Sequence, residues 1–135
     1  MKKEHYIYPA IFDYQDEGIT VTFPDIPGCI TEGNSDEEAF ANAKEVLELC
    51  LLGDEADEIL FPKPTNLNSI LHEPSQRVVL IEAYLDIARE KVKMRYVKKT
   101  ITLPAWINLK AEQCGINFSQ TLQEAIKERL GLVGK

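Results

Sequence analysis

Basic side chains gather at one place in this sequence, between Arg89 and Lys99. Six of these eleven residues are basic and one is acidic. Cations at this density neutralise phosphates, so the segment is a candidate for nucleic-acid binding. Lys93, Arg95 and Lys99 are expected to make electrostatic contacts that do not read sequence. A solvated basic linker explains the same three residues equally well.

The basic segment leads into a short alternating pattern over Val97–Leu103. If these residues form a strand, one face is polar and carries Lys98, Thr100 and Thr102, while Ile101 and Leu103 lie on the other. No second strand follows in the sequence. Because strand backbone groups need partners, an identical strand from a second chain is expected to supply them.

Two helices are expected after this strand. Pro104 can begin the first, which is predicted over residues 105–114 and ends at Gly115. Asn117 caps the second, which ends at Gly131. A strand and two helices in about 35 residues bury too little to fold alone. Intertwined with a copy they form a ribbon-helix-helix, and its paired strands can enter the major groove.

The charge of the chain is divided unevenly between its two halves. Residues 1–76 hold 4 basic and 16 acidic residues, a net charge of −12, and residues 77–135 hold 11 and 6, a net charge of +5. Together they give the overall −7. An acidic half repels nucleic acid and suits a basic partner, whereas the basic half suits phosphates.

The acidic half has the pattern β-β-β-α-β. Strands are predicted over 6–12, 19–23, 29–31 and 77–87, with a helix between Ser35 and Gly53. Pro9 suggests that the first strand is an edge strand or bulged, and the unbroken apolar centre of the last suggests burial on both faces. The helix is expected to bury a stripe of side chains at helical spacing. Its members are Phe40, Ala43, Leu47, Cys50 and Leu51. This α+β arrangement resembles the double-stranded-RNA-binding fold in outline, but its charge argues against RNA as a ligand.

Catalytic and metal chemistry are not expected. Neither histidine, His5 or His72, lies near a cysteine or serine motif, and the three cysteines are too scattered for a zinc site or a disulfide framework. We therefore predict no enzyme activity and no cofactor. The N-terminal residues have no signal-peptide pattern, and no stretch approaches the roughly 20 apolar residues of a membrane span, so a soluble cytoplasmic protein is expected.

Two sets of residues resemble a known family. The run from Lys98 to Pro104 with Gly115–Gln120 resembles the ribbon-helix-helix tail of many HicB antitoxins. Tyr8-Pro9-Ala10, the run from Phe23 to Cys29, and Glu32-Gly33 before an alanine-containing helix are similar to the N-terminal signature of HicB. The resemblance implies a toxin-neutralising domain over 1–88, a basic linker over 89–96, and a dimerising DNA-binding domain over 97–135.

The resemblance also implies a function. HicB proteins are antitoxins of type II toxin–antitoxin systems that mask HicA, a small basic ribonuclease, and repress their own operon. It places base contacts on Lys98, Thr100 and Thr102, and phosphate contacts on Asn117 and Ser119 at a helix N-terminus. The toxin contact is expected on the sheet and on a loop of six residues. These are Phe23, Pro24, Asp25, Ile26, Pro27 and Gly28.

Two other functions fit the sequence. The chain could be a ligand-sensing ribbon-helix-helix repressor without a toxin, although the clustered His and Cys of a nickel sensor are lacking. It could also be a protein-binding module whose basic tail only dimerises. A homodimer is expected in the main interpretation, with a tetramer also open.

Overall fold

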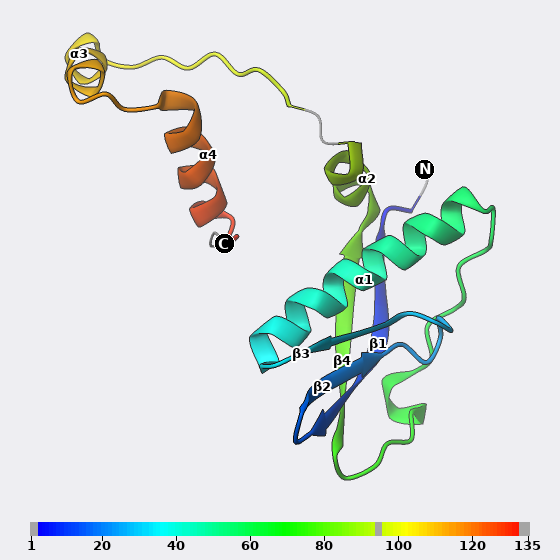
Figure 1. Ribbon diagram of the computed structural model, residues 1–135. Helices are drawn as coiled ribbons and strands as arrows, with labels where there is room; N and C mark the ends of the chain where they lie inside the picture. Colours follow the sequence, from blue (N-terminus) through cyan, green and yellow to red (C-terminus); the bar gives the residue numbers. More distant parts are fainter. Residues whose placement is uncertain (1–2, 94–95, 133–135) are drawn as a thin grey trace. The chain divides into compact units, whose positions relative to one another are not determined.

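The computed structural model describes residues 3–93 and 96–132, and the chain divides into two compact units, residues 1–96 and 97–135. The N-terminal unit contains a sheet covered on one face by a long helix (Figure 1). The C-terminal unit contains two helices. None of the helices described is long and apolar enough to span a membrane.

The sheet has four antiparallel strands in the order β3-β2-β1-β4. The strands are β1 (His5–Gln15), β2 (Gly18–Thr22), β3 (Ile30–Gly33) and β4 (Gln76–Tyr84). A 3-10 turn, η1 (Leu67–Ser69), lies in the connection before β4. The α+β class and the β-β-β-α-β order expected from the sequence are therefore confirmed, while the likeness to the RNA-binding fold stays a prediction.

The prediction that β1 is an edge strand or bulged is wrong in part. β1 is an inner strand, because β2 pairs with its residues 11–15 and β4 pairs with residues 5–13. Pro9 nevertheless lies in the stretch that pairs with β4 alone. A residue without a backbone N–H is tolerated there because one side of the strand has no ladder to complete.

The long helix is α1 (Asp36–Ala56), and it begins as predicted. The Ser35 hydroxyl accepts a hydrogen bond from the Glu38 backbone N–H at 3.1 Å, and the Glu38 carboxylate accepts from the Asn34 backbone N–H at 3.4 Å. The predicted end at Gly53 is wrong, since the helix continues for three more residues. Glycine costs a helix only about 1 kcal/mol, so it does not by itself stop one.

The core lies between α1 and the inner face of the sheet. The helix contributes the buried residues Ala39, Ala43, Leu47 and Leu51. The predicted stripe began at Phe40, which is half exposed, so its first member is Ala39 instead. Small residues face the sheet there because the two backbones approach closely. A Cβ atom on Gly33 would lie 2.5 Å from the Ala39 backbone nitrogen.

The prediction that β4 is buried on both faces is also wrong. Ile81 and Ala83 are buried against the core, but Leu80, the residue before them on the other face, is 51% exposed. An apolar run of this length does not distinguish a doubly covered strand from an edge strand with one open apolar face. After β4 the chain turns directly into α2 (Leu85–Lys93), so most of the segment expected as a basic linker is helical.

The C-terminal unit contains α3 (Ala105–Gln113) and α4 (Phe118–Arg129), close to the predicted bounds. Gly115 between them has a φ of 70°, a conformation that glycine adopts at little cost. Residues 97–104 form no strand in the single chain. A lone strand has no partner for its backbone groups, so pairing with a second chain remains a prediction.

Candidate functional site

The three residues expected to read bases lie in the extended segment before α3. Lys98, Thr100 and Thr102 are all exposed. The apolar residues that alternate with them, Ile101 and Leu103, line a hollow of about 300 Å³ together with Ala105, Asn108 and Phe118. The apolar side of the alternation therefore lies against the helices of the C-terminal unit.

The start of α4 has the expected cap. The Asn117 side-chain oxygen accepts a hydrogen bond from the Gln120 backbone N–H at 3.0 Å. The Ser119 hydroxyl accepts one from the Gln123 side chain at 3.3 Å and is exposed. Asn117 thus acts as a helix cap, and a phosphate role for either residue stays a prediction.

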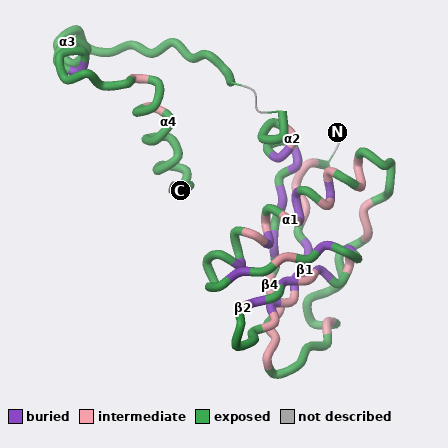
Figure 2. The backbone as a smooth tube through the Cα atoms, in the orientation of Figure 1, coloured by how far each residue is buried: buried purple, intermediate pink, exposed green. Residues whose placement is uncertain are grey.

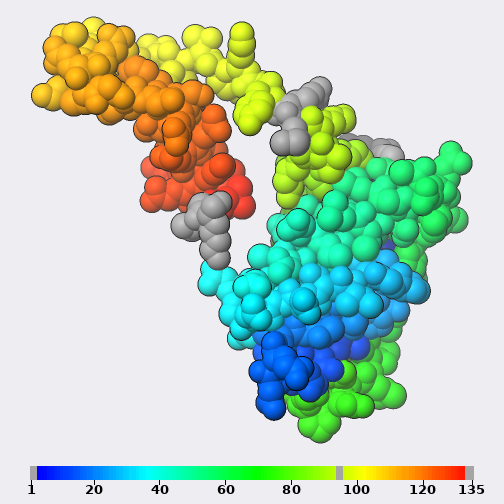
Figure 3. All heavy atoms as spheres, in the orientation of Figure 1, coloured from blue at the N-terminus to red at the C-terminus, as the bar shows by residue number. Residues whose placement is uncertain are grey.

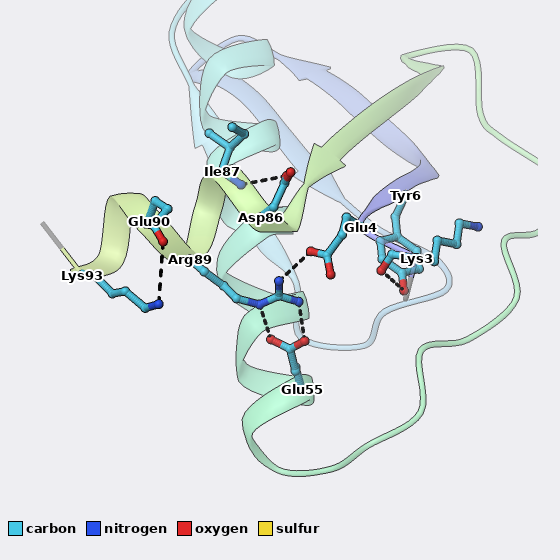
Figure 4. Close-up of polar contacts among 9 residues, drawn as sticks. All are labelled: Lys3, Glu4, Tyr6, Glu55, Asp86, Ile87, Arg89, Glu90 and Lys93. Carbon is cyan, nitrogen blue, oxygen red and sulfur yellow. Dashed lines mark hydrogen bonds and ion pairs between the residues drawn. The ribbon is translucent and has the colours of Figure 1, made fainter. Parts of the chain in front are cut away.

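The basic segment is less available than its sequence suggests, because α2 uses its cations internally. The Arg89 guanidinium binds both carboxylate oxygens of Glu55, at 2.9 and 2.5 Å, and one oxygen of Glu4 at 2.5 Å (Figure 4). These two carboxylates raise the pKa of Arg89 further above its ordinary value. Lys91 pairs with the buried Glu48 at 3.0 Å.

The three expected phosphate contacts in this segment have different surroundings. Lys93 pairs with Glu90 at 3.7 Å, and both side chains are about half exposed. Lys99 is exposed in the segment before α3. Arg95 lies outside the described residues. A phosphate contact by any of the three stays a prediction.

The C-terminal unit leaves its apolar side chains in solvent. Ala111 is the only buried residue among those described in it (Figure 2). The exposed fraction of Trp106 is 72%, and Ile126 on α4 and Leu130 at its C-terminal cap are also exposed. An apolar surface of this kind marks an interaction site, because isolated soluble domains bury such residues.

The loop expected to contact a toxin is built from two consecutive turns. The Ile26 N–H donates to the Phe23 carbonyl oxygen and the Cys29 N–H donates to the Ile26 carbonyl oxygen, both at 3.1 Å. Gly28, with a φ of 84°, follows Pro27 in the second turn, the arrangement of a type II turn.

These turns direct Phe23 and Ile26 into the core, where they are 3% and 5% exposed. Both side chains therefore pack in the core of the single chain, and a toxin contact by either stays a prediction. The Asp25 carboxylate accepts from the backbone N–H of Thr65 at 2.9 Å and from its hydroxyl at 2.5 Å, and so fixes the loop after α1. Only Pro24, Pro27 and Gly28 of the six expected residues are exposed.

One group of acidic residues lies where the β1–β2 hairpin meets the start of α1. The turn of the β1–β2 hairpin, with Asp16 and Glu17, and the start of α1 reach the surface there (Figure 3). The Tyr14 hydroxyl donates to the Asp36 carboxylate at 2.7 Å and connects the two segments. This hydrogen bond raises the pKa of Tyr14.

The histidine and cysteine side chains are the candidate metal ligands and nucleophiles of the sequence, and the structure shows the surroundings of two of them. Among the residues that the structure describes, no group of three or more His, Cys, Asp or Glu side chains could hold a metal ion. His5 lies 3.0 Å from Glu82 on the sheet, far in the sequence from the other histidine. Burial raises the pKa of the Cys29 thiol, so this side chain is protonated and unreactive at neutral pH.

Comparison with known proteins covers both units. The family described as HicB_like antitoxin of bacterial toxin-antitoxin system matches residues 8–128. An uncharacterised 14.9 kDa protein of Haemophilus phage HP1 is 26% identical over 107 residues, which are 79% of this chain and 80% of that protein. Antitoxin HicB 2 of Photorhabdus laumondii is 45% identical over 40 residues, 30% of this chain and 29% of that protein.

A similar solved structure is a toxin–antitoxin complex from Streptococcus pneumoniae. Its matching chain is 25% identical and has a TM-score of 0.56. The match covers 93% of this chain and 99% of that one. The similarity in sequence and in fold thus extends over almost the whole length of both proteins.

Proposed function

The chain belongs to the HicB-like antitoxin family of bacterial toxin–antitoxin systems, a family of antitoxins rather than enzymes, and we propose that it neutralises a HicA-type ribonuclease and represses its own operon. The observation that supports this most directly is the family match over residues 8–128, which includes both units. In this proposal the N-terminal unit binds the toxin and the C-terminal unit binds operator DNA.

The charge of the N-terminal unit supports a basic protein as its partner. Residues 1–96 hold 9 basic and 19 acidic residues, a net charge of −10. A surface of this sign accelerates association with a basic partner and keeps nucleic acid away. The relative from Streptococcus pneumoniae was solved in a toxin–antitoxin complex. A small basic toxin is therefore the partner we propose.

The C-terminal unit supports dimerisation and DNA binding. Its exposed apolar side chains need a second copy to cover them, and its extended segment lacks a backbone partner. Two copies that pair these segments antiparallel would form a ribbon that presents Lys98, Thr100 and Thr102 to the major groove. Lys99, Asn117 and Ser119 would then contact phosphates, with Lys93 and Arg95 at the approach.

One experiment tests the DNA-binding part. The variant Lys98→Ala/Thr100→Ala/Thr102→Ala is expected to bind the promoter fragment of its own operon at least about 30-fold more weakly than the natural chain, as measured by fluorescence anisotropy. Its mass in solution is expected to stay that of a dimer. The control Lys110→Ala/Thr121→Ala removes the same side-chain types from exposed helical positions and should leave affinity within about threefold. Equal affinity of the triple variant and the control would overturn the assignment of the base-reading face.

A second experiment tests the antitoxin part. RNA cleavage by the purified HicA-type protein of the same genome is expected to stop when the chain is added in equimolar amount. DNA affinity is then measured as the toxin-to-antitoxin ratio rises, because toxin binding should change how many dimers occupy the operator. Cleavage that continues at excess antitoxin contradicts the proposed toxin partner.

A further inference from the structure

The sheet of the N-terminal unit has an outer face that α1 does not cover. The strand register places four outer-face side chains directly opposite one another across all four strands. Their order from β3 to β4 is Ile30, Thr22, Ile11 and Val78. On β4 and β1 the row above contains Leu80 opposite Pro9, and the next row contains Glu82 opposite Ile7.

Three apolar side chains on this face are open to solvent, whereas Pro9 on the same face is buried. Ile30 is 57% exposed, Leu80 is 51% exposed and Ile7 is 43% exposed. The three come from three different strands, so they form a patch rather than a single ridge. Scattered apolar side chains are normal on a surface, but a patch that crosses the whole width of a sheet marks a binding surface.

The charged residues on this face are acidic. The row on the other side of Ile30 and Ile11 contains Asp13 and Glu32, and Glu82 lies at the opposite end. Hydrogen bonds from Gln15 and Ser75 lower the pKa of Asp13, so its carboxylate is ionised at neutral pH. No Lys or Arg occupies an outward position on any of the four strands. A histidine, His5, lies on this face beside Glu82.

We propose that this outer sheet face, with Ile7, Ile30 and Leu80 as its exposed apolar residues and Glu32 and Glu82 as carboxylates beside them, is the surface that binds a basic protein. The proposal rests on the proposed function and identifies the occupant as the HicA-type toxin. Exposed apolar residues with polar groups around them are the usual anatomy of a protein interface. The toxin then contacts the face of the sheet that is opposite to α1.

Charge distinguishes this occupant from a second copy of the chain. If this face stacked on the same face of a second copy, Asp13, Glu32 and Glu82 of both chains would share one interface. Neither sheet would contribute an outward lysine or arginine to offset them. Like charges at an interface disfavour association by several kcal/mol. A basic partner meets the same carboxylates with attraction. The face is therefore suited to a basic protein and not to dimerisation.

The test uses the full chain and the purified HicA-type protein of the same genome, with its catalytic histidine replaced. The variant Ile30→Lys/Leu80→Lys changes two exposed apolar residues on the two edge strands. Its affinity for the toxin is expected to fall at least 100-fold in isothermal titration calorimetry. The matched control is Phe40→Lys/Leu49→Lys, which makes the same change at side chains on α1 that are 50% and 53% exposed. It should bind within threefold of the natural chain.

Each result has one meaning. If the natural chain binds the toxin and the Ile30→Lys/Leu80→Lys variant binds equally well, the surface assignment is wrong and the antitoxin function stands. If the control loses binding and this variant does not, the toxin binds on the α1 side and the assignment is again wrong. If the natural chain does not bind the toxin, both proposals fail.

A milder variant keeps the test decisive if the lysine variant does not fold. Glu32→Gln/Glu82→Gln preserves the shape of the surface and removes two charges. Its association rate constant, measured by stopped-flow fluorescence, is expected to fall about tenfold at low salt and to depend less on ionic strength than that of the natural chain. An unchanged rate and salt dependence would show that these carboxylates do not face the toxin.

Discussion

The Tyr8 side chain shows what one polar group contributes inside the N-terminal unit. It is 1% exposed, and its hydroxyl donates a hydrogen bond to the Pro62 carbonyl oxygen at 2.5 Å. Burial and nearby negative charge raise the pKa of Tyr8 from 10.0 to about 12. The folded chain therefore favours the neutral phenol more than the unfolded chain does.

This shift predicts a loss of stability in alkali. A pKa that is raised on folding gives a stabilising contribution that is complete below pH 10 and disappears as the pH rises toward 12. Between pH 8 and pH 11 the natural chain is expected to lose about 1 kcal/mol more of its unfolding free energy than Tyr8→Phe does. At pH 7 the variant should be less stable by about 1 kcal/mol, the value of a lost hydrogen bond. Urea unfolding at the three pH values measures both differences, and parallel pH curves for the two proteins would contradict the raised pKa.

Several residues were predictable at this scale because their role is local. Ser35 and Asn117 cap helices, and a cap depends only on the residue type and the three positions that follow it. The roles of Arg89 and Asp25 were not predictable, because their partners, Glu4 and Thr65, are 85 and 40 positions away. A basic residue in a basic run gives no sign that two distant carboxylates bind it.

At the scale of elements, the contact between β3 and α1 depends on Gly33. A Cβ atom at this position would lie 2.5 Å from the Ala39 nitrogen and 2.7 Å from its Cα atom. Both are backbone atoms, so they cannot move without displacing the helix. Gly53, within the same helix, has no neighbour within 4 Å of its would-be Cβ atom and no positive φ.

The two glycines are expected to respond to alanine in opposite directions. Gly33→Ala should lower the unfolding free energy by about 2 kcal/mol or more, because it overpacks a rigid contact. Gly53→Ala should raise it by about 1 kcal/mol, because alanine favours a helix interior. Urea unfolding followed by circular dichroism gives both values. A stabilised Gly33→Ala would mean that α1 lies farther from β3 than the structure shows.

The elements themselves were largely predictable, and their burial was less so. Alternation located β2, and the cap located the start of α1, since these are properties of short segments. Whether the apolar run of β4 is covered on one face or two depends on the number of layers in the fold. The residues of the run carry no information about that number. The open outer face around Leu80 was missed for this reason, although Glu82 within the same strand was a sign of an exposed face.

At the scale of the whole molecule, the C-terminal unit can report its own assembly. Trp106 is the only tryptophan of the chain and lies in this unit with 72% of its surface exposed. If a second copy covers the apolar surface, the emission maximum of Trp106 is expected to move to shorter wavelength as protein concentration rises through the dimer dissociation constant. Dilution series at fixed salt measure this. An emission maximum that is constant from nanomolar to micromolar concentration, in a protein whose mass is that of a monomer, would contradict the dimer.

The near-absence of buried side chains in the described part of the C-terminal unit has a consequence for the lifetime of the protein in a cell, if the proposed dimer forms. If this unit folds fully only when paired, it is accessible to proteases whenever it is single, and at low abundance the paired fraction falls in proportion to the amount of chain. When synthesis stops, each molecule lost leaves the remaining ones more often unpaired, so degradation accelerates as it proceeds. The N-terminal unit has its own core and does not share this weakness. If the proposed dimer binds the operator, an interruption of gene expression would then cause an abrupt rather than a gradual loss of operator occupancy.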